Sequence, residues 1–282
     1  MSFKQITIIG VGLLGGSLGL AARQRRLAGT IVGVGHREST LRTAHKRGAV
    51  DRYTLDTAEG VRGADLVILA TPVGLFGPTM RQAAPALAKG CVITDVGSTK
   101  RAVLEAVVPL VPRGCRFVGS HPIAGSEARS IDAARADLFE GALTVIVPTE
   151  RSDPASMDAV EKLWHALGSH TRRLDAETHD RLLAESSHLP HAVAAALLHA
   201  LSPEAETVTG KGFLDMTRIA SGDPAMWRDI LVTNADEVER SIDELEAALG
   251  ELKKAMKRGD AEAVQRFLQE AKSRRDKLLG PS

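Results

Sequence analysis

The sequence of 282 residues lacks three features that would point to particular classes of protein. Its formal net charge is only +1, which excludes the basic field of a nucleic-acid-binding protein and a polybasic membrane anchor. It shows no apolar run of membrane-spanning length and no signal-peptide pattern. Its two cysteines, Cys91 and Cys115, lie beside apolar stretches and predict buried, reduced thiols rather than a disulfide. We therefore expect a cytoplasmic protein with no nucleic-acid or membrane partner.

A glycine motif near the amino end carries the first functional signal. The β-branched run Gln5–Gly10 leads into residues 10–15, which read G-x-G-x-x-G, and a helix pattern follows. Gly10 permits a tight turn, Gly12 lets the backbone approach a pyrophosphate, and Gly15 allows close helix–strand packing. The helix would offer its first N–H groups to the phosphates. A glycine-rich turn without a ligand is the alternative. The predicted dinucleotide contacts are Gly10, Gly12, Leu13, Leu14 and Gly15.

The end of the second predicted strand, Thr30–Val34, bears on the choice of cofactor. NAD-binding units place Asp or Glu about 20 residues after the glycines, where it holds the ribose. Here no acid closes the strand, and the basic and hydroxyl side chains that follow suit a 2′-phosphate, so NADP is favoured over NAD. Alternatively, Ser39 caps the next helix and Arg37 is a surface charge. The predicted contacts are His36, Arg37, Ser39 and Thr40.

Further strands alternate with helices up to about residue 174. Strands are predicted at Asp65–Ala70, Cys91–Val96, Arg116–Gly119 and Leu143–Val147, and Asp153-Pro154 begins a helix. This alternation predicts an α/β fold, a Rossmann-like doubly wound parallel sheet. Ligands of such sheets bind beyond the carboxyl ends of the strands. Four segments meet there, namely the glycine motif, Thr71-Pro72, Ser98 and His121.

From Asp175 the strands stop, which predicts a dinucleotide-binding domain of residues 1–174 and an all-α domain of residues 175–282. We expect a helix over Ala176–Ala200 with a kink or a break at Pro190, a loop over Gly210–Arg218, and a long helix from Asp223-Pro224. Apolar residues then repeat in a seam that packs within the domain or across a dimer interface. The seam consists of Val238, Ile242, Leu245, Leu249, Leu252 and Met256.

His188 and His191 lie three residues apart and can share one helix face. No Cys or third ligand accompanies them at a usual zinc spacing, so no metal site is predicted.

Six segments form a recognisable set, in order and over nearly the whole chain. They are GVGLLGGSL at 10–18, TDVGSTK at 94–100, GSHPIAGSE at 119–127, HD at 179–180, SHLPHAVA at 187–194 and GFLDMTRIASGDPAMWRDI at 212–230. Together they resemble the prephenate/arogenate dehydrogenases. The resemblance implies NAD(P)-dependent oxidative decarboxylation of prephenate to 4-hydroxyphenylpyruvate, or of arogenate to tyrosine, in tyrosine biosynthesis. It also implies a homodimer whose helical domain contributes to substrate binding.

The chemistry needs a proton acceptor for the substrate hydroxyl, and His121 suits this because imidazole titrates near neutral pH. The resemblance implies that Ser98 orients His121, that Arg218 grips a carboxylate, and that His191 and Ser120 also contact the substrate. Without the resemblance, His121 could be a turn residue, Ser98 an N-cap, and Arg218 a partner of Asp215.

Glu127 leaves two roles open: it could hold Arg218, or it could meet the ammonium group that only arogenate carries.

Two rival functions are weighed. One is another NAD(P)-dependent dehydrogenase, of the β-hydroxyacid or imine-reducing type, which would use a catalytic lysine or lack the histidine turn. The other is a sensor that binds NADP without turnover. The rival dehydrogenases lack the SHLPH segment that stands here at 187–191, and the set Ser98, His121 and Arg218 argues against the sensor.

Overall fold

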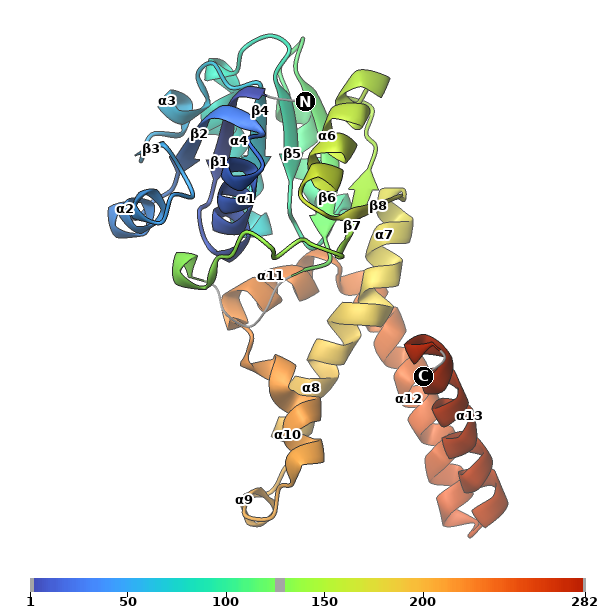
Figure 1. Ribbon diagram of the computed structural model, residues 1–282. Coiled ribbons are helices and arrows are strands. Elements are labelled where there is room, and N and C mark those ends of the chain that lie inside the picture. The colour runs from blue at the N-terminus through green and yellow to red at the C-terminus, as the bar shows by residue number, and fades with distance from the viewer. Residues whose placement is uncertain (1–2, 125–129, 281–282) are drawn as a thin grey trace. The chain divides into compact units, whose positions relative to one another are not determined.

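A single sheet of eight strands forms the centre of the computed structural model, which describes residues 3–124 and 130–280 (Figure 1). The strands are β1 Phe3–Ile9, β2 Ala28–Val34, β3 Arg52–Thr54, β4 Leu66–Leu69, β5 Val92–Asp95, β6 Arg116–Pro122, β7 Leu143–Val147 and β8 His170–Arg173. Their order is β3-β2-β1-β4-β5-β6-β7-β8, and the first six are parallel to one another. The predicted α/β, doubly wound sheet is confirmed.

Helices cover both faces of this sheet because its central strands are apolar on both faces. The helices are α1 Leu13–Gln24, α2 Glu38–Lys46, α3 Thr57–Val61, α4 Phe76–Ala83, α5 Arg101–Val107 and α6 Pro154–Ala166. Leu18 of α1 and Trp164 of α6 belong to one buried cluster, and Phe76 of α4 and Val107 of α5 belong to another. Two separate cores of this kind hold the strand ends in fixed positions.

Strand β7 departs from the predicted all-parallel sheet, because it runs antiparallel to β6. The link between β6 and β7 contains no long helix, only the short turn Ile131–Ala133 among its described residues, so the chain returns alongside β6 in the opposite direction. Strand β8 then pairs parallel to β7. The reversal leaves His121, near the end of β6, opposite Val145 of β7.

The helical part begins with α7 Ala176–Leu183, continues through a π-helical turn at Ala184–His188, and enters α8 Leu189–His199. Pro190 occupies the first turn of α8, and its missing N–H accounts for the interruption that was predicted there. The π turn places His188 in the interior, where its side chain is 1% exposed.

Two predictions for this part are wrong. The segment 210–218 is mostly the helix α10 Lys211–Thr217, which follows the short α9 Pro203–Glu206, so Gly212 does not prevent helix formation. The long helix predicted from residue 223 is divided into α11 Pro224–Thr233 and α12 Ala235–Lys257. Asn234 lies between them with φ −128° and ψ 32°, and its buried side chain bonds to other elements.

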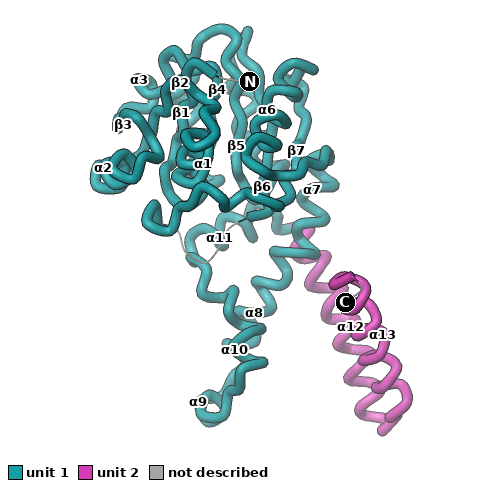
Figure 2. The backbone as a smooth tube through the Cα atoms, in the orientation of Figure 1, with its two compact units in different colours: residues 1–235 teal, residues 236–282 magenta. Residues whose placement is uncertain are grey.

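The chain packs as two compact units, residues 1–235 and residues 236–282 (Figure 2). The second consists of α12 and α13 Ala261–Leu279, which Asp260 caps by accepting a hydrogen bond from Ala263 N at 2.9 Å. This division follows packing alone, and the functional boundary between residues 174 and 175 stays a prediction. No helix among the described residues is both long and apolar enough to cross a bilayer.

Candidate active site

The turn between β1 and α1 has the close packing that its glycines predicted. Gly10 has φ +101°, and a Cβ there would lie 2.6 Å from the backbone of Ala70. A Cβ on Gly15 would lie 1.9 Å from the carbonyl oxygen of Gly10. Side chains are therefore excluded where the helix meets the strand, and α1 begins at Leu13 with no acid in its first turn. A phosphate group would therefore meet no negatively charged side chain in this turn.

The neighbouring strand ends add polar groups to the same edge. Thr71 follows β4, and its hydroxyl is buried with no hydrogen-bond partner among the described residues. An orphaned buried hydroxyl at this position fits a site that a ligand completes. After β2, the side chains of His36, Arg37 and Ser39 are exposed, and Arg37 rather than Ser39 is the N-cap residue of α2. The alternative in which Ser39 serves as the cap is therefore wrong.

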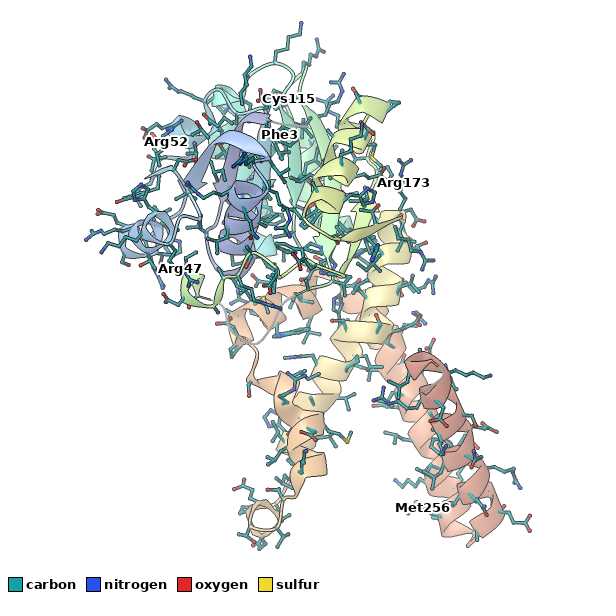
Figure 3. All side chains as sticks on the ribbon, viewed as in Figure 1. Phe3, Arg47, Arg52, Cys115, Arg173 and Met256 are labelled. Atoms are coloured by element: carbon teal, nitrogen blue, oxygen red, sulfur yellow. The ribbon has the colours of Figure 1, made fainter. Side chains whose placement is uncertain are left out.

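Figure 3 labels two residues at the other end of the sheet, opposite the glycine turn. Phe3 begins β1, and Cys115 comes just before β6. The same figure also labels Arg47, beyond α2. The Arg47 guanidinium donates to the carbonyl oxygens of Ile131 and Ala134 at 2.6 and 2.8 Å. Arg47 therefore joins the segment that leads from residue 130 toward β7 to the end of α2.

His121 lies near the carboxyl end of β6 and is 8% exposed. Its Nδ1 lies 2.9 Å from Nε2 of His179, on α7. Burial, followed by the nearby His179 and Lys100, holds the pKa of His121 well below its usual range. At neutral pH the imidazole is therefore uncharged and able to accept a proton.

His179 is itself held by the next residue in the chain. Its Nδ1 lies 2.7 Å from Oδ1 of Asp180, and both side chains are fully buried. Asp180 also accepts backbone N–H bonds from Lys100 at 2.7 Å and Arg101 at 2.9 Å. Burial raises the pKa of Asp180, but the hydrogen bonds from His179 and these two amides outweigh it and leave the pKa below its usual value. Asp180 is thus an ionised carboxylate.

A second buried group anchors the end of β5. Lys100 Nζ donates to Asp95 Oδ2 at 2.7 Å and to the Gly97 carbonyl oxygen at 2.7 Å, and both charged side chains are fully buried. Ser120 was predicted to contact the substrate, but its side chain is fully buried and donates to the carbonyl oxygen of Asp95. The structure therefore gives Ser120 a role in joining β6 to β5 rather than an open position.

Ser98 lies in the turn between β5 and α5 and is partly exposed. The N-cap of α5 is Lys100, so the alternative in which Ser98 caps this helix is wrong. His121 Nδ1 is hydrogen-bonded to His179, whereas Ser98 was predicted to orient this ring. The role of Ser98 toward the substrate hydroxyl stays a prediction.

His191, in the first turn of α8, stacks on Trp227 of α11 with ring centroids 3.6 Å apart and planes at 10°. A Cβ on Gly222 would lie 2.4 Å from the Trp227 ring and 3.2 Å from His191, so glycine is needed where the chain passes this stack. Burial lowers the pKa of His191, and its Nδ1 is buried without a partner among the described residues. A neutral imidazole with one unused nitrogen fits a ligand contact.

Arg218 opens the turn Arg218–Ser221 that follows α10, and its side chain is exposed. Glu127, the other predicted substrate contact, lies outside the described residues. Within the described ranges, no three His, Cys, Asp or Glu side chains are arranged to hold a metal ion.

The sequence placed His179-Asp180 in a segment shared with the family, but it did not predict the contact of His179 with His121 or the stacking of Trp227 on His191. Nothing in the dipeptide His179-Asp180 itself predicts a contact with His121, which lies 58 residues earlier in the sequence. Only the packing of α7 against β7 and α5 brings them together.

Two family models together match most of the chain. The prephenate dehydrogenase nucleotide-binding domain matches residues 18–172, and the prephenate dehydrogenase dimerization domain matches residues 175–270. The chain belongs to the prephenate dehydrogenase family. Members of this family are NAD(P)-dependent oxidoreductases, so the predicted enzyme class is confirmed and a nicotinamide cofactor is expected at the glycine turn.

Individual members of the prephenate dehydrogenase family agree with this assignment. The prephenate dehydrogenase of Bacillus subtilis is 34% identical over 97% of this chain and 76% of its own length. The structure of A. aeolicus prephenate dehydrogenase with hydroxyphenyl propionate and NAD+ is 32% identical, covers 98% of both chains and has a TM-score of 0.91. Synechocystis arogenate dehydrogenase is 30% identical, covers 97% of this chain and 99% of its own, and has a TM-score of 0.84.

Proposed function

We propose that this protein is a homodimer that oxidatively decarboxylates prephenate or arogenate in tyrosine biosynthesis and prefers NADP. The observation that carries the proposal is the uncharged His121, held near the carboxyl end of β6 at the sheet edge that also bears the glycine turn. The dimerization-domain match over residues 175–270 supports the homodimer. The two cysteines are free and buried, which fits a reducing compartment such as the cytoplasm.

The reaction couples three bond changes. His121 accepts the proton of the ring hydroxyl as that oxygen becomes a carbonyl. A nicotinamide cofactor held at the glycine turn of Gly10, Gly12 and Gly15 would supply the acceptor for the hydride on the carbon that carries this oxygen. The electron pair of the ring–carboxylate bond passes into the ring as carbon dioxide leaves, and the phenolate oxygen regains the proton. Aromatisation drives the last change, so this chain's residues must bind, orient and move one proton.

The helical part supplies the groups for the substrate carboxylates. Arg218 is proposed to hold one of them, because a guanidinium pairs with a carboxylate through two parallel N–H bonds. His191 offers its unpartnered nitrogen from a ring that Trp227 fixes in place. Neither group needs to move charge during the reaction, so both contribute to orientation.

NADP preference is proposed from the tip of β2. No carboxylate lies between Val34 and Arg37, where one would bind the ribose hydroxyls and repel a phosphate. The first acid, Glu38, pairs with Arg42 at 3.1 Å. The exposed side chains of His36, Arg37 and Ser39 supply a cation and a hydroxyl for the 2′-phosphate.

An initial-rate assay tests the proposal directly. Purified protein is mixed with prephenate or arogenate and with NAD or NADP, and reduced nicotinamide and carbon dioxide are followed together. We expect equal amounts of both products, with the higher kcat/KM for NADP. A His121→Asn variant should bind cofactor normally and lose about 1,000-fold in kcat. Cofactor binding without turnover in all four mixtures would favour a sensor.

A further inference from the structure

A line of three buried side chains lies behind the proposed base. It runs from His121 Nδ1 to His179 Nε2 at 2.9 Å, and from His179 Nδ1 to Asp180 Oδ1 at 2.7 Å. The exposed fraction is 8% for His121 and zero for the other two residues. Water therefore does not compete for these hydrogen bonds, and the protonation of each nitrogen depends on its neighbour.

The direction of each hydrogen bond follows from the carboxylate. An ionised Asp180 can only accept, so Nδ1 of His179 carries a proton and donates it. Burial holds the pKa of His179 below its usual value, although Asp180 opposes this effect, so the ring is neutral and its Nε2 has a lone pair. Nδ1 of His121 must then donate to that lone pair. The remaining nitrogen of His121, Nε2, is left as the acceptor.

We infer that His179 and Asp180 are positioning residues which fix His121 in the tautomer whose Nε2 accepts the substrate's proton. This inference rests on the proposed role of His121 and extends it to two residues that do not touch the reacting atoms. The arrangement resembles in logic the buried aspartate that orients the histidine of a serine hydrolase, with one more imidazole in the line.

Asp180, at the far end of this line of side chains, is itself held in place, and this allows the line to orient His121. Asp180 is bonded to the backbone N–H groups of Lys100 and Arg101, at the start of α5, and its own carbonyl oxygen accepts from Asn234 Nδ2 at 2.8 Å. Asn234 Nδ2 also lies 3.1 Å from Nδ1 of His188. These contacts join α7 to α5, to the π turn and to the end of α11, so Asp180 cannot turn away without breaking several buried bonds.

Two substitutions of equal length test the inference. In His179→Gln, the side-chain carbonyl oxygen can take the place of Nε2 and accept from His121 Nδ1. In His179→Met, a chain of similar size fills the space but provides only a weak acceptor. We expect kcat to fall by less than about 10-fold for Gln and by about 100-fold for Met. KM and cofactor Kd should change by less than about threefold in both.

A measurement independent of activity uses the wild-type enzyme with 15N-labelled histidine. NMR should find the proton of neutral His121 on Nδ1 and none on Nε2, and His179→Met should give a mixture of both tautomers. Equal kcat for the Gln and Met variants, or a proton on Nε2 in the wild type, would overturn the inference. Turnover by His121→Asn would instead refute the proposed base, whereas an inactive His121→Asn beside two fully active His179 variants would reject the positioning pair alone.

Discussion

The regions that match the two family models differ in where they place their apolar side chains. In residues 3–174, strand and helix side chains form two cores, and Leu55, Leu75, Ile123 and Leu143 are the large apolar side chains left exposed in the described part. Of the 14 large apolar side chains exposed among the described residues, the other ten lie after residue 174. The first region buries most of its large apolar side chains, whereas the second leaves apolar surface that a second copy can cover.

The largest expected effect tests this comparison by placing one negative charge on the exposed apolar surface of each region in turn. Leu214 in α10 is 59% exposed and Leu55, between β3 and α3, is 56% exposed, so the two form a matched pair. We expect Leu214→Glu to raise the dimer Kd by about 100-fold, because an unpaired carboxylate would be buried at the interface. Leu55→Glu should leave the dimer intact. Sedimentation at several concentrations measures both, and equal Kd values would place the interface elsewhere.

A smaller effect is expected at the glycine turn between β1 and α1, which is proposed to bind the cofactor. Gly10→Ala places a Cβ 2.6 Å from the Ala70 backbone, at a φ of +101° that alanine rarely adopts. We expect the free energy of unfolding to fall by about 2 kcal/mol and the cofactor Kd to rise at least tenfold. Thermal unfolding and cofactor titration measure the two effects. An unchanged cofactor Kd would show that the turn does not need this conformation to bind.

The strands that could be predicted from the sequence are those whose side chains are mostly buried. The strands β1, β4, β5 and β7 are short apolar runs, so pattern alone located them. Strand β3 has three residues, and β8 reads His-Thr-Arg-Arg at the edge of the sheet, so neither carries an apolar signal. The direction of β7 depends on the path of the link that precedes it, which no local pattern encodes.

The helical part and the site show the same limit. No proline or glycine marks the helix break at Asn234 in the sequence. The break instead accompanies hydrogen bonds from the Asn234 side chain to Asp180 and His188, which are distant in the sequence. His121 could be found from the turn that follows its strand. Its partner His179 could not, because their contact joins β6 to α7 and is a product of tertiary packing.

The smallest expected effect is a gain in stability from a second glycine-to-alanine substitution, opposite in sign to the loss expected for Gly10→Ala. Gly250 lies within α12, and a Cβ there would meet nothing within 4 Å. Gly250→Ala should therefore raise the free energy of unfolding by about 1 kcal/mol, because glycine is the poorer helix former and loses more backbone freedom on folding. Thermal unfolding beside Gly10→Ala measures both. A destabilising Gly250→Ala would mean that this face of α12 is closely covered in the dimer, as the backbone at Gly10 is within one chain.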